Sequence, residues 1–478
     1  MRDIRTSKKR VMVGFEGIVN SVDESEMSLR YAKTCHNFAF SGGALTGEIG
    51  IDAASGYYAF PSLDRHQYQA FESANQIKKA FLYRRIASNG LHDDRIVVQL
   101  SDGSFWQTNV FWNENWKQVP SLSMDGDVEG VNYNYNGKDV LLLCSAQDGL
   151  YMINDATAYA CSSAPKFTSI AVHNERVFGS VNGVDNQVWF SDDFDPANWK
   201  VSATEAGYVS FADDFGEAIK VVSFLGYLYI FREYGIFRLT AYGNQNDFML
   251  KKVFTDTGRI YKNSIALSGD KIMFCAEDGV FAFDGYDAVR VAKEMPIVKN
   301  KNTIACAYLD NCYYIACNLK ECAGNKNNAV VKYDTEKKEI SVLDGVCVSG
   351  FCTVKTHNGS DVICCFEGDN KNRLGMMSKS GKVFLADTVK KYESPLSILG
   401  DTRLKIVREI ALVSKYPLTL MVEIDGKLFK YQVKGSDVLQ KIPIEKSGYR
   451  IKFLLESNAQ YAYVASVSAY VEVTRGAV

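Results

Sequence analysis

Hydrophobic positions along this chain alternate with polar ones in short runs, and helical spacing of three or four residues is almost absent. Alternation with a period of two places every second side chain on the same face of a strand. The runs are separated by Asp-Gly and Asn-Gly pairs, among them Asp102-Gly103, Asp148-Gly149, Asn136-Gly137 and Asp425-Gly426. Such pairs supply the positive φ angles of two-residue hairpin turns. The pattern therefore predicts an all-β protein built from consecutive hairpins.

The stretch from Lys262 to Gly285 illustrates a repeating unit. It predicts strands at Ser264 to Leu267, Lys271 to Cys275 and Val280 to Phe283, with a fourth at Ala288 to Ala292. Similar meanders recur about every 40 to 50 residues, and their middle strands lie near Val177, Leu228, Ile272, Tyr313 and Val362. This period is typical of a β-propeller, whose blades bury their faces against one another. About seven four-stranded blades fit residues 61–388; a large β-sandwich, the alternative, would leave long exposed edges.

The pattern changes on both sides of this region. After Asp387 the predicted strands are longer and lie at Thr402 to Val413, Thr419 to Ile424, Lys427 to Lys434, Tyr449 to Glu456 and Ala462 to Val473. They predict a C-terminal antiparallel β-sandwich over residues 389–478, with a linker at Lys390 to Pro395. Residues 1–60 are polar and Gly-rich, and they predict an N-terminal arm that becomes ordered against neighbours or the propeller.

Charge and composition narrow the function classes. The 54 Lys and Arg residues are balanced by 56 Asp and Glu, so the formal net charge of −2 argues against a duplex-DNA reader. No run approaches the roughly 20 apolar residues of a membrane span, and the basic start has no apolar segment of a secretory signal behind it. The 12 cysteines lack the spacing of a disulfide framework and are predicted to be buried thiols of a reducing compartment.

Several segments resemble a known family. Phe167 to Gly179 followed by Gln187 to Trp199 resembles a blade of tail β-propeller proteins from double-stranded DNA bacteriophages, in which a strand pair is followed by a DP(x)NW turn. Ala218 to Leu239 and Gly258 to Gly285 are similar to the next two blades, and Asn37 to Leu45 to the opening of such chains, although Glu48-Ile49 stands where an Arg is common. The motif positions are Trp189, Ser191, Asp195, Pro196, Trp199, Asp278, Gly279, Asp284 and Gly285.

The resemblance implies a non-enzymatic virion component, made in the host bacterial cytoplasm. It would be a nozzle or tail-tip subunit of a closed homo-oligomeric ring, commonly a hexamer, that builds the DNA exit channel and helps retain or release the genome. Its partners would be other tail proteins, namely adaptor, tube or fibres, with transient non-specific DNA in the lumen and no membrane. A placement beside the tail tube of a long-tailed phage is also open. The rival hypothesis is a propeller that binds or cleaves host-surface glycans, and a third is a generic propeller interaction scaffold.

The candidate chemistry favours structural roles. Asp192, Asp193 and Asp195 could form the carboxylate pair of a glycosidase, but Asp195-Pro196 fits the start of a β-turn better. Asp125 to Gly130 starts like an EF-hand loop, yet Asn136 stands where the bidentate Glu is needed. Cys306, Cys312, Cys317 and Cys322 form no CxxC and have no histidine among them. We therefore predict no catalytic residue, no metal site and no cofactor.

Short basic runs are the remaining candidates. They would face DNA phosphates in a ring lumen, where symmetry multiplies the charge of each chain and weak contacts let the genome pass. The residues are Lys8, Lys9, Arg10, Lys78, Lys79, Arg84, Arg85, Lys299 and Lys301. The competing interpretation is that these runs are ordinary solvated surface.

Overall fold

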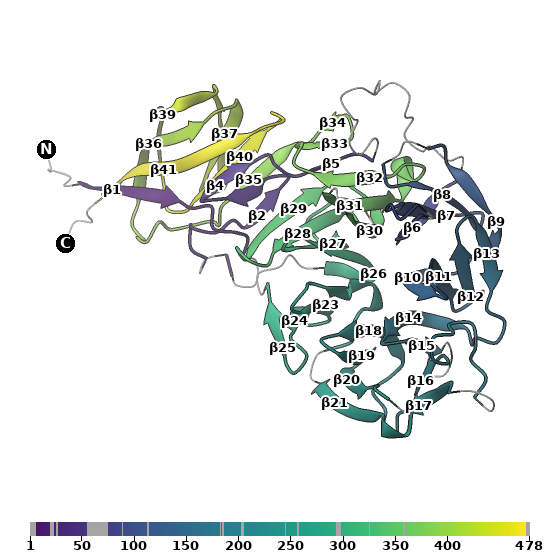
Figure 1. Ribbon diagram of the computed structural model, residues 1–478. Coiled ribbons are helices and arrows are strands. Elements are labelled where there is room, and N and C mark those ends of the chain that lie inside the picture. Colours follow the sequence, from purple (N-terminus) through teal and green to yellow (C-terminus); the bar gives the residue numbers. More distant parts are fainter. Residues whose placement is uncertain are drawn as a thin grey trace, which may run out of the picture.

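The fold is almost entirely β-strand (Figure 1). The computed structural model describes residues 6–19, 23–24, 27–54, 75–87, 89–111, 114–181, 183, 186–201, 205–243, 245–255, 258–292, 298–324, 326–356 and 359–474. Within these ranges, regular helix is confined to the short 3-10 turns η2 (Gln245–Asp247), η3 (Lys262–Ser264) and η4 (Gly368–Asn370). No helix among the described residues has the length and apolar character to cross a bilayer.

Seven sheets form the blades of a propeller. The first six are antiparallel, four-stranded and built from consecutive strands, and the seventh has six strands. Blade 1 comprises β6 (Ile77–Tyr83), β7 (Arg95–Leu100), β8 (Ser104–Asn109) and β9 (Lys117–Ser123). Blade 2 comprises β10 (Val128–Tyr135), β11 (Lys138–Ser145), β12 (Gly149–Asn154) and β13 (Thr157–Ala160). Blade 3 comprises β14 (Phe167–His173), β15 (Arg176–Val181), β16 (Gln187–Phe190) and β17 (Gly207–Ser210). Blade 4 comprises β18 (Ala218–Phe224), β19 (Tyr227–Arg232), β20 (Gly235–Thr240) and β21 (Met249–Thr255). Blade 5 comprises β22 (Ala266–Leu267), β23 (Ile272–Ala276), β24 (Gly279–Phe283) and β25 (Ala288–Val291). Blade 6 comprises β26 (Val298–Leu309), β27 (Cys312–Leu319), β28 (Ala329–Asp334) and β29 (Glu339–Asp344).

Blade 7 closes the ring with a strand from the N-terminal segment. It combines β30 (Val348–Thr356), β31 (Gly359–Phe366) and β32 (Gly375–Ser378) with β5 (Gly50–Ala53), and β33 (Lys382–Val383) and β34 (Ala386–Asp387) extend it. Met377 on β32 lies opposite Ile51 on β5. The inner strand β30 packs against β6 of blade 1. The predicted propeller of about seven blades is therefore confirmed, and its first and last parts are held in one sheet.

Aromatic side chains fill the spaces between blades. Between blades 4 and 5, the rings of Phe231 and Phe274 meet edge to face with centroids 5.6 Å apart, and Tyr229 and Phe283 do so at 5.2 Å. These four side chains belong to one buried cluster. Edge-to-face pairs are favourable beyond their area burial. The aromatic richness of the sequence is thus explained by packing between blades.

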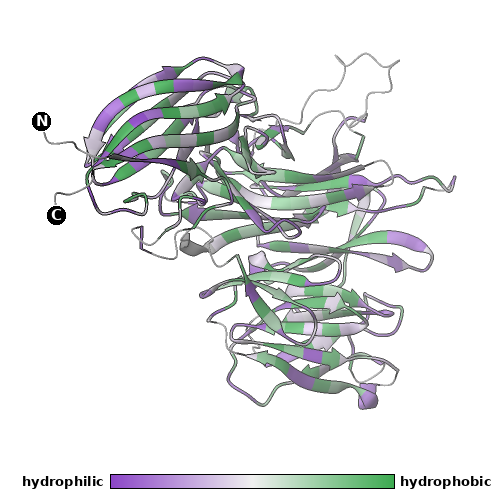
Figure 2. Ribbon diagram, turned by 90° about the vertical axis from the view of Figure 1, so that its left-hand side faces the viewer, coloured by the Kyte–Doolittle hydropathy of each residue, from purple (hydrophilic) through white to green (hydrophobic). Residues whose placement is uncertain are grey.

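The C-terminal domain is a sandwich of two antiparallel sheets. One has the order β3 (Ala39–Ser41), β4 (Ala44–Thr46), β41 (Tyr463–Thr474), β36 (Lys405–Ser414), β39 (Ser436–Gly448), with β1 (Thr6–Val13) also on β41. The other has the order β2 (Thr34–His36), β35 (Lys390–Glu393), β40 (Ile451–Ser457), β37 (Leu418–Ile424), β38 (Lys427–Val433). Hydrophobic and polar residues alternate along these strands in Figure 2, as a two-layer core requires. The predicted sandwich is confirmed.

The segment predicted as a linker is instead part of the sandwich. Lys390 to Glu393 forms β35, which pairs with β40 on one side and β2 on the other. Lys390 is fully buried, and its ammonium group donates hydrogen bonds to the carbonyl oxygens of Gly381 and Thr388, each at 3.1 Å. Burial lowers the pKa of this lysine. The linker prediction was wrong because a satisfied ammonium group allows a lysine in a buried strand.

The N-terminal segment joins both domains. Of the predicted arm over residues 1–60, β1 to β4 lie in the sandwich and β5 lies in blade 7. Between them, Asn37 accepts a hydrogen bond from the backbone of Asp344 at 2.8 Å and donates one from its own backbone to Val342 at 2.7 Å. Both partners belong to β29 of blade 6. The segment therefore fastens the sandwich to the propeller.

Candidate functional site

The propeller axis is crossed by a network of five charged side chains. Lys79 of blade 1 pairs with Asp127 at 2.5 Å, and Lys262, next to blade 5, pairs with Asp127 at 3.6 Å and Glu129 at 3.1 Å. Lys220 of blade 4 reaches Glu129 at 3.6 Å. Because these blades are not all adjacent, such contacts can form only across the centre of the ring. The network therefore occupies the central channel.

The lysines dominate the electrostatics of this network. Burial would raise the pKa of Glu129, but Lys220, Lys262 and Lys79 outweigh it and lower that pKa to about 2. For Lys262, burial opposes the charged form, and the two carboxylates nevertheless raise its pKa. Asp127 and Glu129 lie in the segment that resembles an EF-hand loop. Since three ammonium groups hold these carboxylates, the segment is suited to ion pairing and not to binding a cation.

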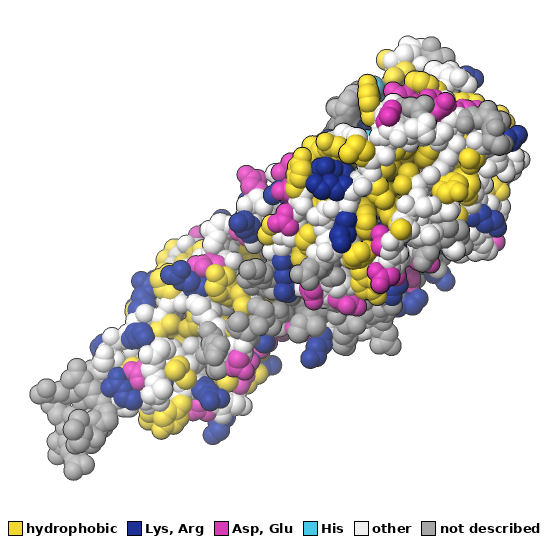
Figure 3. Space-filling view, turned by 90° about the horizontal axis from the view of Figure 1, so that it is seen from below, with side chains coloured by type: hydrophobic (Ala, Val, Ile, Leu, Met, Phe, Trp, Pro, Cys, Tyr) yellow, Lys and Arg dark blue, Asp and Glu magenta, His cyan; other side chains and the backbone are white. Residues whose placement is uncertain are grey.

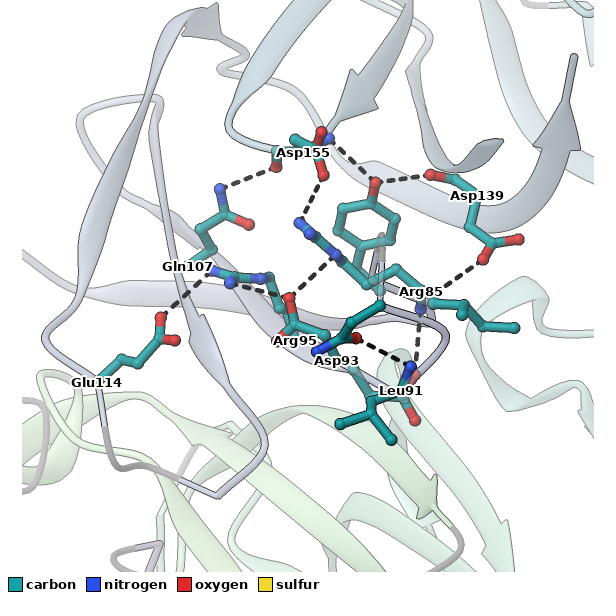
Figure 4. A network of polar contacts seen from close by, with 12 residues as sticks. Arg85, Leu91, Asp93, Arg95, Gln107, Glu114, Asp139 and Asp155 are labelled. Atoms are coloured by element: carbon teal, nitrogen blue, oxygen red, sulfur yellow. Dashed lines mark hydrogen bonds and ion pairs between the residues drawn. The ribbon is translucent and has the colours of Figure 1, made fainter. Parts of the chain in front are cut away.

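Arg85 belongs to a second network, which joins blades 1 and 2 (Figure 4). Its guanidinium contacts Asp93 at 3.1 Å and Asp155 at 2.8 Å. Asp93 also pairs with Arg95 at 3.1 Å, and Arg95 reaches Glu114 at 3.6 Å. Of the sequence candidates for DNA contact, Arg85 and Lys79 are thus neutralised by carboxylates within the propeller.

Arg84 lines an open pocket of about 310 Å³ beside this network. It is exposed, and its guanidinium donates a hydrogen bond to the carbonyl oxygen of Lys355 at 3.1 Å. The lining comprises Arg84, Arg85, Ile86, His92, Asp94, Asp139 and Lys355. Among the described residues, no carboxylate forms an ion pair with Arg84 or Lys355. Asp94 and Asp139 also line this pocket, which we call the basic pocket after Arg84 and Lys355, the two cations that can accept a phosphate or carboxylate group there.

A second basic depression lies on the sandwich. It has a volume of about 450 Å³ and is lined by Lys8, Lys9, Arg10, Arg408, Glu409, Tyr470, Val471 and Glu472. Arg408 pairs with Glu445 at 2.6 Å and Glu472 at 2.7 Å. The Tyr470 ring lies 5.8 Å from the guanidinium of Arg10 and 5.7 Å from the ammonium group of Lys441. Tyrosine and arginine are enriched in protein interfaces, and Tyr470, Arg10 and Arg408 lie together here.

The structure does not bring the sequence candidates into one site. Lys8, Lys9 and Arg10 lie on β1, at the far end of the sandwich from β6 and the Arg84 pocket (Figure 1). Lys78 donates to the carbonyl oxygen of Asp125 at 2.8 Å. The side chains of Lys299 and Lys301 lie outside the described residues. Lys355 and Arg408 were missed because each is a single basic residue in a strand and gains its neighbours only through folding.

The Asp-rich segment after β16 is a structural turn. Asp195 accepts a hydrogen bond from the backbone of Ala197 at 3.0 Å, and Trp199 donates one from Nε1 to the carbonyl oxygen of Pro196 at 2.8 Å. Trp199 is 2% exposed, and its ring lies 4.6 Å from that of Phe167. Ser191 is also buried and accepts a hydrogen bond from the backbone of Val177 at 3.1 Å.

The neighbouring carboxylates are equally engaged. Asp192 accepts hydrogen bonds from the side chain of Asn198 at 3.2 Å and the backbone of Glu205 at 3.1 Å. Asp193 pairs at 2.8 Å with the buried Arg176. Trp189 stacks on Tyr208 with centroids 5.1 Å apart. These contacts give the carboxylates of this segment turn-forming and packing roles.

The motif of blade 5 consists of two turns. Asp284 accepts hydrogen bonds from the backbones of Tyr286 and Asp287, each at 2.9 Å, and Asp278 accepts one from Gly258 at 3.2 Å. Gly279 and Gly285 have φ angles of 136° and 101°. A Cβ on Gly285 would lie 2.7 Å from the Tyr229 hydroxyl, so only glycine fits this turn.

Asp361 on β31 is half-buried, and its Oδ2 atom is buried without a hydrogen-bond partner among the described residues. Burial raises its pKa to about 6. We expect Asp361→Asn to stabilise the chain at pH 8 by about 1–2 kcal/mol, less than the full linkage value because the side chain is partly exposed. A raised carboxyl pKa costs stability as pH rises from the unfolded value towards 6, so the gain should vanish at about pH 4. Urea unfolding at pH 8 and pH 4 measures the difference in stability between Asp361→Asn and the wild type. An equal difference at both pH values would contradict a raised pKa of Asp361.

The sequence matches no protein-family profile and no curated protein. Among solved structures, BamB from Moraxella catarrhalis is 10% identical, with a TM-score of 0.36, and the match covers 72% of this chain and 94% of that chain. BBS1N, crystallised in complex with ARL6DN, is 9% identical, with a TM-score of 0.41 and coverage of 69% and 97%. Hsv2 from Kluyveromyces lactis is 13% identical, with a TM-score of 0.35 and coverage of 59% and 93%. At these identities the similarity concerns the fold and carries no inference about activity or partners.

Proposed function

We propose that this protein is a non-enzymatic structural subunit of a bacteriophage tail, a nozzle or tail-tip component that assembles into a ring. The observation that carries the proposal is the segment from Gln187 to Trp199. Together with Phe167 to Gly179 it resembles a blade of phage tail propellers, and its polar groups serve packing and turn formation. A structural subunit that holds other tail proteins needs such stabilising contacts more than it needs a reactive site.

The central channel of the propeller is not the expected route of DNA, because charged side chains fill it. Lys79, Asp127, Glu129, Lys220 and Lys262 meet across the axis, so side chains occupy the passage within one chain. A DNA conduit would therefore lie between copies of the protein in the assembled ring. The basic pocket at Arg84 and the depression at Arg10 are the candidate surfaces for DNA and for tail partners.

The outer part of blades 3 and 4 offers a candidate surface between subunits. Tyr208, Tyr234, Tyr242 and Met249 are exposed by 45% to 80%. Figure 3 shows hydrophobic side chains gathered with basic ones on this side of the molecule. Exposed aromatic and methionine side chains are enriched in protein interfaces. This composition supports ring assembly through the propeller.

Oligomeric state and glycan activity together test the proposal. Light scattering after size exclusion and electron microscopy of the purified chain should reveal closed rings of constant copy number. Incubation with host-surface polysaccharide should yield neither stable binding nor shorter products. A monomer that binds or cleaves the polysaccharide would overturn the structural assignment in favour of the glycan-directed alternative.

Replacing Arg84 tests the basic pocket. We expect the double substitution Arg84→Gln and Lys355→Gln to weaken binding to duplex DNA of any sequence and to lower the slope of log affinity against log salt by about 1 per residue. Fluorescence anisotropy with a short duplex at several salt concentrations measures this slope. The control is Lys427→Gln, an exposed lysine on the sandwich. An unchanged slope in the double variant would exclude the pocket as a phosphate contact.

A further inference from the structure

Three side chains that can bind a metal ion meet where the sandwich contacts the propeller. His36 ends β2 of the sandwich, Asp344 ends β29 of blade 6, and Cys322 lies in the loop after β27. Strands β2 and β29 lie side by side in Figure 1 and are in contact. Among the residues that the structure describes, this is the one group of three His, Cys, Asp or Glu side chains whose ligand atoms all lie within 4.8 Å of one another.

The distances are close to those of a tetrahedral zinc site. Nδ1 of His36 lies 3.4 Å from a carboxylate oxygen of Asp344. Zinc bonds of about 2.0–2.3 Å place tetrahedral ligand atoms about 3.3–3.8 Å apart. The nitrogen and oxygen already have this separation, and the sulfur needs a shift of up to about 1.3 Å, within reach of one rotation about its χ1 bond. The three atoms can thus occupy three corners of one tetrahedron.

The backbone that carries these ligands is held in place by two buried asparagines. Asn37, which follows His36, accepts a hydrogen bond from the backbone of Asp344 at 2.8 Å. Asn328 donates to the carbonyl oxygen of Cys322 at 2.9 Å and accepts from the backbone of Gly345 at 3.1 Å. Both asparagines are 6% exposed. The ligand positions are therefore fixed by groups that a metal would not displace.

The burial of the three ligands leaves one side accessible. Cys322 is 5% exposed, whereas the side chains of His36 and Asp344 are 12% and 30% exposed. An ion can therefore reach the group from the Asp344 side, where water can supply a fourth ligand. Imidazole, thiolate and carboxylate together favour zinc over the oxygen-preferring calcium and magnesium.

We propose that His36, Cys322 and Asp344 form a zinc site that joins the sandwich to blade 6. On binding, the thiol of Cys322 loses its proton to solvent and its sulfur bonds to the metal, while His36 and Asp344 contribute a nitrogen and an oxygen. The ion connects two domains that also meet through packing and through hydrogen bonds such as those of Asn37 with Val342 and Asp344. It restrains their relative motion.

Metal analysis of the full chain tests the site. The reduced protein is stripped with a chelator, loaded with Zn²⁺ and desalted. We expect one zinc per chain, and under a tenth of that in Cys322→Ser and His36→Gln. Cys161→Ser is the matched control because Cys161 is also 5% exposed and lies in the core between blades 2 and 3; it should retain one zinc. Unmodified protein without zinc, or variants that retain it fully, would overturn the proposal.

Cobalt provides a test that needs no variant. Co²⁺ added to the stripped wild-type chain should produce a near-ultraviolet thiolate charge-transfer band of one sulfur ligand, and Zn²⁺ should abolish it. Hydrogen exchange of β2 and β29 should slow several-fold on zinc binding, since a ligand that binds the docked state suppresses opening. The absence of the thiolate band would exclude Cys322 as a ligand and with it the site, whatever the stability of the variants.

Discussion

Replacing Glu129 by glutamine is expected to destabilise the propeller by about 3 kcal/mol at pH 7. The Glu129 side chain is 13% exposed and lies between Lys220 and Lys262 in the central channel. Glutamine keeps the shape but removes the charge, so Lys220, whose side chain is only 25% exposed, loses its carboxylate partner. An uncompensated buried charge costs far more than an exposed one. Urea unfolding followed by tryptophan fluorescence measures the loss.

The effect of Glu129 should depend on pH in a defined direction. Its pKa in the folded chain, about 2, lies below the ordinary value of 4.5. A lowered carboxyl pKa contributes stability above the unfolded value, and this contribution disappears as pH falls through the folded value. The difference between wild type and Glu129→Gln should therefore be largest above pH 5 and shrink towards pH 2.

Two comparisons separate the channel from ordinary ion pairs. Glu445→Gln removes a carboxylate that pairs with Arg408 but is 58% exposed, and we expect a loss below about 1 kcal/mol. Adding Lys220→Met to Glu129→Gln removes the uncompensated ammonium group and should restore much of the stability. If Glu129→Gln and Glu445→Gln were equally mild, the channel network would contribute no more than a surface pair.

The local pattern of the sequence predicted the blades well because each blade is made of consecutive hairpins. Its Asp-Gly and Asn-Gly turns and alternating runs are short-range signals. Val177, Leu228, Ile272, Tyr313 and Val362 all lie on the second strands of their blades, as the repeat predicted. The aromatic residues likewise identified a packed β fold before any long-range contact was known.

The strands that were missed depend on distant partners. β5 has four residues, and it becomes a strand because β32, more than 300 residues later in the chain, offers it an edge. β35 carries a buried lysine that hydropathy marks as exposed. β39 is largely exposed along its 13 residues, so its sequence lacks the alternation of hydrophobic and polar residues that predicts a strand. In each case the information lies in pairing and not in local sequence.

The candidate sites show the same division. Sequence identified Arg84 and Arg85 as a basic pair, but folding gives them opposite environments, one exposed in a pocket and one between two carboxylates. In the sequence, Cys322 belongs to a cysteine cluster that contains no histidine. His36 comes close to Cys322 only because the sandwich contacts blade 6. Adjacency in sequence thus says little about the charge that a side chain meets in the fold.

Trp199→Ala should have the other large effect, a loss of about 3–5 kcal/mol. Trp199 is 2% exposed and fills the core between blades 2 and 3 against Phe167, so alanine leaves a cavity that rigid strands cannot close. Trp199→Phe keeps most of the volume and should lose about 1 kcal/mol with the hydrogen bond to Pro196.

The matched control for Trp199 is Trp189→Ala, because Trp189 belongs to the same segment but stacks half-buried on Tyr208. We expect a loss of about 1 kcal/mol there, since water already reaches the ring and no closed cavity forms. Thermal unfolding ranks the stability losses of the three variants. Hydrogen exchange in β11 and β14 shows whether the loss lies between blades 2 and 3. Faster exchange in these strands for Trp199→Ala alone would assign this turn to holding two blades together. Equal losses at both tryptophans would mean that the turn stabilises only its own blade.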